Sequence, residues 1–240
     1  LTASCFVTYA TILPFMNIAQ SFVVKTYHGP GSKGEQEEMA ATYMAATFFV
    51  GACFAPVVGV LVDKFGKRAK VTIVSSLLIG LAHVLFRYLF PLIPFMILGL
   101  GYTLYGSSVW PSISYVIKDE QEGTAYGLTT AVQNLGLAVT PLLVALLYSF
   151  DSQYTYVSLF FIILSGVGVG IGIWLTREDL AIGGILDKNS EEATALKKNL
   201  YLKSNSSPKV KGIFNPEKGF DADDEGISSD DETPLLKKIT

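Results

Sequence analysis

The chain has 240 residues, half of them hydrophobic, and its mean hydropathy is +0.42. Charged residues make up 16%, below the roughly 25% of soluble domains, which argues against an ordinary soluble protein. Residues 177–240 hold ten of the 18 basic and thirteen of the 21 acidic residues, so the net charge of −3 describes neither the apolar body nor the polar remainder.

Six apolar runs are long enough to cross a membrane as helices, which takes about twenty residues each. A backbone in lipid must satisfy its own hydrogen bonds, so we expect each run to be helical despite its internal prolines. The short alternating segments of a β-barrel are not visible in the sequence. The runs occupy residues 2–24, 39–62, 70–90, 93–117, 123–149 and 154–176.

The loops between the runs differ in their basic residues, and this difference predicts orientation. We expect the loops after the second and fourth runs to face the cytosol, because most loop cations lie there: Lys64, Lys67, Arg68, Lys70 and Lys118. An even number of spans then places both ends of this chain in the cytosol. The chain begins at Leu1 almost inside a span, so we expect earlier helices to precede it; a complete six-helix protein is the alternative.

Residues 177–240 are rich in Lys, Ser, Asn, Asp and Glu and poor in large apolar residues. Such a composition buries too little surface to offset the entropy of ordering, which predicts a disordered tail. A short amphipathic helix near 190–202 is compatible with its pattern. The predicted division is therefore a membrane bundle over 1–176 and a cytosolic tail over 177–240.

The sequence gives no indication of an enzyme. Cys5 and Cys53 lie inside apolar runs, where we interpret them as small core residues and not as a disulfide or metal site. We find no metal-ligand spacing, no nucleophile constellation and no phosphate-binding loop. We therefore predict no catalytic residue, no cofactor and no nucleic-acid partner.

The stretch GVLVDKFGKRAKV at 59–71 joins the second and third runs. A positive-inside loop explains its basic residues but not the spacing G-x-x-x-D-K-x-G-K-R. That spacing resembles the loop signature of the major facilitator superfamily of transporters, in which it joins the second and third helices of each six-helix half. The matching residues are Gly59, Asp63, Lys64, Gly66, Lys67 and Arg68.

The resemblance implies an all-α membrane protein whose six transmembrane helices form the C-terminal half of a twelve-helix fold. An N-terminal six-helix half would then be its partner. In this family the aspartate, here Asp63, sits beside the cytosolic N-terminus of a helix in the other half, where the helix dipole favours an anion. Basic residues add salt bridges, and together they close the cytosolic side when the transporter faces outward. We expect Lys64, Lys67 and Arg68 to face the lipid headgroups.

A second stretch, SVWPSISYVIKDEQEGTAYGLTTAVQNLGLAV, resembles a narrower group, the lysosomal dipeptide transporters of this superfamily. The likeness covers roughly residues 40–175, whereas the loop YHGPGSKGEQEEM and the acidic tail depart from the group. It implies export of dipeptides from the lysosomal lumen to the cytosol by alternating access, in a multi-pass lysosomal membrane protein. It also implies a glycosylated lysosomal accessory membrane protein as a partner. The matching elements are WP at 110–111, GTAYG at 123–127 and QNLGLA at 133–138.

By the same resemblance, the first, second, fourth and fifth helices line a substrate cavity near the membrane midplane, and the third and sixth are peripheral. Polar residues at spacings of three and four place one polar face on each of the fourth and fifth runs. The alternative is that these groups join helices to one another, as small polar residues do in membranes. Our candidate substrate contacts are Asn17, Tyr43, Tyr105, Trp110 and Gln133.

No Asp or Glu lies in the middle of any apolar run, although proton-driven transporters usually need a buried carboxylate. His83 lies on a peripheral run, where we expect a buried histidine whose polar atoms have hydrogen-bond partners. Transport is therefore expected to be uniport, unless coupling residues lie in the other half. Rival functions are transport of another solute, such as a sugar or organic anion, and a receptor or scaffold that moves nothing. The intact gating signature favours a transporter.

The sequence ends in DDETPLLKKIT, where Asp231 precedes the pair Leu235 and Leu236 by four and five positions. This matches the acidic dileucine pattern that clathrin adaptors bind on cargo for endosomes and lysosomes. An acid meets a basic adaptor patch, the leucines fill apolar pockets, and Pro234 keeps the peptide extended. We predict a sorting signal here, with clathrin adaptors as partners of the tail.

Overall fold

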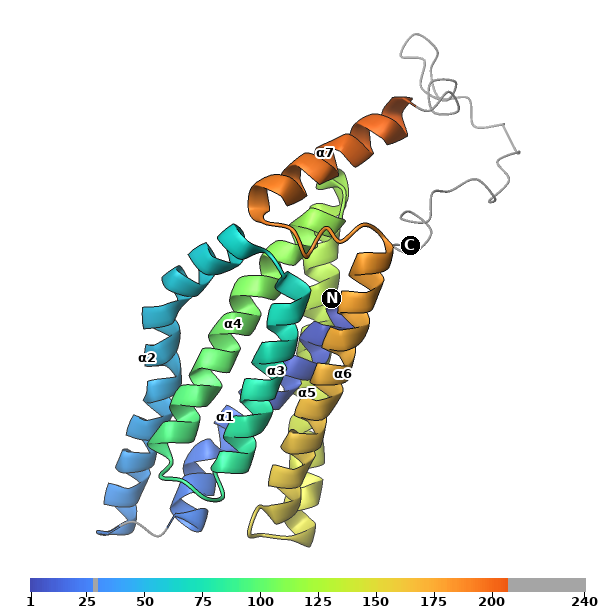
Figure 1. Cartoon of the computed structure of the whole chain (residues 1–240). Coiled ribbons are helices and arrows are strands. Elements are labelled where there is room, and N and C mark those ends of the chain that lie inside the picture. Colours follow the sequence, from blue (N-terminus) through green and yellow to red (C-terminus); the bar gives the residue numbers. More distant parts are fainter. Residues whose placement is uncertain (28–29, 207–240) are drawn as a thin grey trace.

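The computed structural model describes residues 1–27 and 30–206, which form helices and no strand. Six long helices stand side by side as a bundle, with a seventh across one end (Figure 1). The elements are α1 (Thr2–Thr26), α2 (Lys33–Phe65), α3 (Arg68–Leu85), α4 (Leu92–Val116), the 3-10 turn η1 (Asp119–Gln121), α5 (Glu122–Phe150), α6 (Thr155–Ala181) and α7 (Ser190–Ser206).

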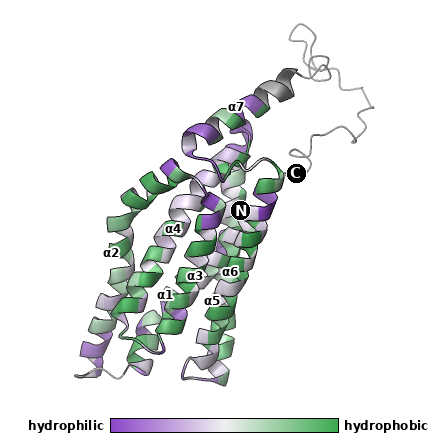
Figure 2. Cartoon of the chain, in the orientation of Figure 1, coloured by the Kyte–Doolittle hydropathy of each residue, from purple (hydrophilic) through white to green (hydrophobic). Residues whose placement is uncertain are grey.

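The six predicted spans are confirmed as helices that are long and apolar enough to cross a membrane. Prolines lie inside four of them without ending them, as membrane helices tolerate. Hydrophobic residues occupy much of the length of the long helices (Figure 2), and large side chains such as Phe49 and Leu142 are each 71% exposed. An apolar outer surface of this kind suits contact with lipid.

Aromatic side chains fill the middle of the bundle. Phe15 of α1 is 2% exposed, and its ring centroid lies 5.0 Å from that of Phe86 and 5.6 Å from that of Phe161. His83 of α3 lies between Phe15 and Phe161, at 4.8 and 5.1 Å. The structure thus buries His83, as expected, but its Nε2 has no hydrogen-bond partner among the described residues, so the expectation of a fully satisfied histidine is wrong. These contacts join α1, α3 and α6 into one core.

The helices also approach closely where small residues face one another. A methyl group on Gly99 of α4 would overlap the backbone of Thr47 in α2. At this contact the Thr47 hydroxyl donates to the Phe95 carbonyl at 3.1 Å. The Ser75 hydroxyl of α3 donates to the Gly101 carbonyl at 2.7 Å. Such bonds join helices in lipid, so part of the polar content of the spans serves packing.

The start of α1, the turn between α2 and α3, η1 and the end of α6 all lie at one end of the bundle (Figure 1). Leu1 and Val116 pack against the cluster formed by Ala69, Leu186 and Ala193 at this end. Both ends of the six-span unit therefore lie at the end that carries the charged turn, which we define as residues 63–70. That this end faces the cytosol stays a prediction.

The ordered part of the chain extends beyond the predicted boundary at 176. Helix α6 continues to Ala181, and the Asp179 carboxylate then accepts a hydrogen bond from the Leu186 amide at 2.9 Å. Ile185 and Leu186 are 7% and 2% exposed. Burial of these two apolar side chains stabilises this part of the chain, which the composition of the tail did not predict. Helix α7 contains the helix expected near 190–202. We call residues 182–206 the C-terminal segment.

Candidate gating turn and substrate face

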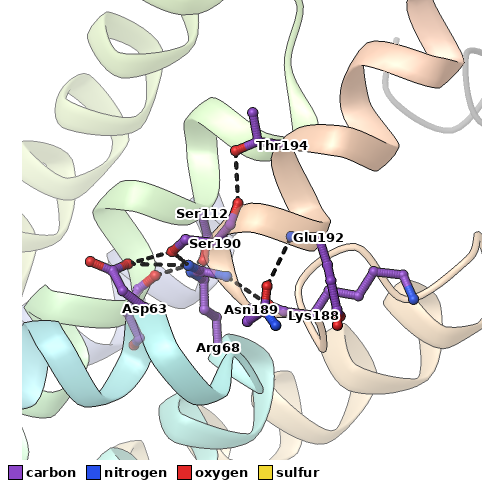
Figure 3. A network of polar contacts seen from close by, with 9 residues as sticks. Asp63, Arg68, Ser112, Lys188, Asn189, Ser190, Glu192 and Thr194 are labelled. Atoms are coloured by element: carbon purple, nitrogen blue, oxygen red, sulfur yellow. Dashed lines mark hydrogen bonds and ion pairs between the residues drawn. The ribbon is translucent and has the colours of Figure 1, made fainter.

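The charged turn is built around Asp63, near the end of α2. Its Oδ1 accepts a hydrogen bond from the Ser190 hydroxyl at 2.7 Å and a weaker contact from Arg68 Nη2 at 3.3 Å. Arg68 Nη2 also donates to Ser190 Oγ at 2.7 Å, which closes a three-membered network (Figure 3). Asp63 therefore has partners inside this chain, at the junction with the C-terminal segment.

The expectation that Arg68 faces the headgroups is wrong. Its side chain is fully buried, because the C-terminal segment lies over it. The guanidinium lies 4.4 Å from the ring centroid of Tyr115, and Nη1 donates to the Lys188 carbonyl at 3.0 Å. Lys64 and Lys67 are exposed. The positive-inside pattern does not distinguish an arginine that anchors a turn from one that meets lipid.

The two signature glycines differ in their surroundings. Gly66 has a positive φ of 65°, and a methyl group there would overlap the backbone of Lys188. A methyl group on Gly59 would meet no atom of the described residues within 4 Å. Gly66 thus makes room for the C-terminal segment, whereas Gly59 stands at an open part of α2.

Tyr105 and Trp110 lie together on α4 but are placed differently. Tyr105 is fully buried, and its hydroxyl donates to Ser4 Oγ at 2.9 Å. Trp110 is half-buried, and its Nε1 donates to the Tyr9 hydroxyl at 2.6 Å. The Trp110 ring stacks on Tyr126 of α5, at 6.0 Å between centroids and 9° between planes. We therefore assign Tyr105 to packing and keep Trp110 as a substrate candidate.

The remaining candidates lie on three helices and are not brought into one cluster. Asn17 of α1 is exposed, and Gln133 of α5 is half-buried without a hydrogen bond to any described residue. Tyr43 of α2 is half-buried against Phe90, with ring centroids 5.0 Å apart. Tyr43 thus belongs to the aromatic packing at the end opposite the charged turn.

Two helices carry exposed stripes of small or polar residues that differ from the apolar surface elsewhere. The stripe on α5 repeats at helical spacing and lies beside leucines and valines that are also exposed. Small side chains let another helix approach closely, and polar side chains are costly in lipid, so these stripes suit another protein surface or a water-filled cavity. The residues are Asn17, Gln20 and Ser21 of α1, and Gly127, Ala131, Asn134 and Ala138 of α5.

Sequence reasoning missed two groups of residues. Tyr9 was not singled out, although it joins α1 to the Trp110 aromatic group. Ser190 and the other partners of the charged turn were missed because they lie in the predicted tail. The sequence held a signal for the start of α7, because Asn189 is a residue type that is preferred as an N-cap. In the structure, Asn189 Oδ1 accepts from the Glu192 amide at 2.8 Å, as an N-cap side chain does.

Comparisons with known proteins agree with this architecture. The family model of the Major Facilitator Superfamily matches residues 1–211. The chain is also similar to curated proteins called lysosomal dipeptide transporter MFSD1. The Homo sapiens protein is 28% identical over 196 residues, which is 80% of this chain and 40% of that protein. The Gallus gallus protein is 26% identical, covering 81% of this chain and 43% of that protein.

The Danio rerio protein is 31% identical over 137 residues, or 56% of this chain and 28% of that protein. The chain thus spans about two fifths of the length of the human and chicken relatives. The family predicted from the charged turn is confirmed, because the family match covers most of the chain. This protein belongs to the Major Facilitator Superfamily.

Proposed function

We propose that this chain forms one six-helix half of a transporter that moves dipeptides from the lysosomal lumen to the cytosol. The observation that carries the proposal is the charged turn, where Asp63 is held at the end of α2 with a side chain 61% exposed. A scaffold that moves nothing has no need of such a gating acid. The substrate class rests on the names of the relatives, which are called lysosomal dipeptide transporters.

The proposed mechanism is alternating access without proton coupling. A second six-helix half would cover the stripes of small or polar residues on α1 and α5, and the substrate would bind between the halves near Asn17, Trp110 and Gln133. The central parts of the six spans carry no Asp or Glu that a proton could neutralise. Uniport driven by the peptide gradient is therefore the simplest mechanism that these helices support.

The proposed location is the lysosomal membrane, with both ends of this chain in the cytosol. The excess of lysines at the end with the charged turn supports that orientation. The proposed partners are the bilayer, the other half of the transporter and a glycosylated lysosomal accessory membrane protein. Clathrin adaptors would bind Asp231, Leu235 and Leu236, which lie outside the described residues.

The test is ligand-dependent melting of the full-length protein with a panel of dipeptides, free amino acids, sugars and organic anions. A ligand at 100 times its dissociation constant stabilises the folded state by about 2.7 kcal/mol, which shifts the melting temperature measurably. We expect stabilisation by dipeptides alone, and dipeptide flux into proteoliposomes that a proton gradient does not change. Stabilisation by a sugar or organic anion instead of dipeptides would overturn the substrate class.

A further inference from the structure

The C-terminal segment caps the start of α3. The Leu186 carbonyl accepts from the Arg68 amide at 2.8 Å, and the Asp187 carbonyl accepts from the Lys67 amide at 3.2 Å. The first amides of a helix have no acceptor within the helix, so these two carbonyls satisfy groups that would otherwise lack a partner. The segment is thus bonded to the charged turn through the backbone itself.

Side chains strengthen the same junction. Lys70 Nζ contacts Asp187 Oδ1 at 2.6 Å, next to the bond from Arg68 to the Lys188 carbonyl. Arg68 is fully buried beneath this segment, and displacing the segment would remove two of its acceptors, the Lys188 carbonyl and the Ser190 hydroxyl. The junction is therefore a fixed contact and not a loose surface encounter.

The other end of the contact lies on α7. Lys197 Nζ donates to the Ser114 carbonyl, near the end of α4, and to Asp119 Oδ1 in η1, both at 2.6 Å. The segment therefore connects the turn between α2 and α3 with the turn between α4 and α5. These two turns lie at the same end of the bundle (Figure 1).

At the centre of this arrangement, Asp63 is held by one oxygen only. Oδ1 accepts from both Ser190 and Arg68, whereas Oδ2 makes no hydrogen bond to any residue that the structure describes. Figure 3 shows Oδ2 directed away from Ser190 and Arg68. A carboxylate fixed through one oxygen has a defined orientation and keeps its other oxygen available to accept a further hydrogen bond.

We propose that the C-terminal segment is part of the cytosolic gate and that Ser190 is the positioning residue that orients Asp63. The Ser190 hydroxyl accepts from Arg68 Nη2 and donates to Asp63 Oδ1. Oδ2 is then directed to the opposite half when the cytosolic side closes. Loss of the hydroxyl frees the carboxylate to rotate, which weakens the closed state. The inference rests on the proposed function for the existence of a gate and of the opposite half that Asp63 would face.

The experiment measures gate opening directly in the full-length protein. In a Cys53→Ser background, Ala131→Cys places a thiol on the exposed stripe of α5, and a membrane-impermeant maleimide is applied from the cytosolic side. Ser190→Ala is expected to raise the labelling rate about three- to tenfold, because a hydrogen bond to a charged group is lost. Lys197→Ala, which removes the contacts of α7 with Ser114 and Asp119, is expected to change the rate in the same direction.

Two matched variants separate positioning from general damage. Ser190→Thr keeps the hydroxyl and is expected to stay within about twofold of the wild-type rate. Thr194→Ala removes an exposed hydroxyl that bonds only the Ser190 carbonyl within α7, and no change is expected. Wild-type labelling in Ser190→Ala, or equal acceleration in Ser190→Ala and Thr194→Ala, would overturn the positioning role.

The labelling needs no substrate, so the two proposals fail separately. If wild-type protein moves no dipeptide while Ser190→Ala still labels faster than Ser190→Thr, the substrate class is wrong and the role of Ser190 stands. If dipeptide flux is present while Ser190→Ala labels like wild type, the role of Ser190 is wrong and the transport proposal stands.

Discussion

Gly66 and Lys188 approach so closely that a methyl group on Gly66 would overlap the Lys188 carbonyl. The family signature places a glycine at this position, and here the glycine admits the C-terminal segment to the charged turn. The backbone at Gly66, with φ 65° and ψ −129°, is also one that residues with a Cβ rarely adopt. Space and backbone conformation therefore both select glycine.

The first prediction is that Gly66→Ala destabilises the full-length protein. Backbone strain alone costs about 1–3 kcal/mol, and the overlap with Lys188 adds to it. The matched control is Gly59→Ala in the same signature, where the methyl group meets no described atom and the helix gains from alanine. Melting temperatures should fall for the first variant only. Equal melting temperatures for the two variants would contradict this account of Gly66.

The second prediction concerns the charge of Asp63. Asp63→Asn keeps an oxygen acceptor for Ser190 and Arg68 but removes the anion, so the fold should persist. Loss of a favourable helix-dipole contact costs about 0.3–1 kcal/mol, or about 2 kcal/mol if partly buried, which shifts the gate several-fold. We expect slower transport by a protein that still folds and reaches its membrane. The control is Glu120→Gln, which neutralises an exposed acid on η1 outside the charged turn. Wild-type flux in correctly localised Asp63→Asn protein would contradict the prediction.

The sequence predicted most of the bundle because membrane spans are set by local properties. A span needs about twenty apolar residues in a row, and each of the six runs satisfies this on its own. The junction at Arg68 was not predictable in the same way. Its burial depends on Leu186 and Lys188, more than a hundred residues away, and neither stands out in a polar tail.

The third prediction separates packing from substrate contact. Tyr105→Phe removes the buried bond to Ser4, which should lower the free energy of unfolding by about 0.5–2 kcal/mol and leave the KM for substrate unchanged. Gln133→Ala should raise KM about tenfold with little loss of stability, because Gln133 bonds no described residue. Melting temperatures and uptake kinetics of both variants test this pair. A raised KM in Tyr105→Phe would return that residue to the substrate site.

The candidate site was harder to predict than the helices for a physical reason. Helical spacing places Tyr105 and Trp110 on α4, but it does not indicate which neighbour satisfies each polar group. Tyr9 accepts from Trp110 and Ser4 accepts from Tyr105, and both acceptors come from α1, about a hundred positions earlier. Only the packed structure shows whether the hydroxyl of a tyrosine already has a hydrogen-bond partner in the bundle or is available to bind a substrate.

The fourth prediction concerns sorting. Replacing Leu235 and Leu236 by Ala in the full-length protein should leave the protein at the cell surface. The adaptor pockets would lose both apolar side chains, and the acid at Asp231 alone would not hold the tail. The control replaces Lys237 and Lys238 by Ala, which keeps the pattern. Imaging that finds the double leucine variant in lysosomes, with none at the surface, would refute the signal.

The last prediction is a pH dependence at the opposite end of the bundle, where Asp151 begins the turn into α6. Asp151 Oδ1 accepts from the Gln153 amide at 2.9 Å, and Oδ2 accepts from the Thr155 amide at 2.8 Å. The bond from Gln153 first, and the other bonds near the start of α6, lower the pKa of this carboxyl below its ordinary value of 3.8.

Because the folded pKa is depressed, the charged form of Asp151 stabilises the fold above pH 3.8, and this contribution is lost as the pH falls through the lower folded value. Asp151→Ala should therefore melt below wild type at neutral pH, with the gap closing in strong acid. If the proposed orientation is correct, this turn lies in the lysosomal lumen, and the lowered pKa keeps the cap charged there. Melting curves of wild type, Asp151→Ala and the control Ser152→Ala across acidic and neutral pH test it. A gap that stays constant with pH would show that the lost charge is not the cause.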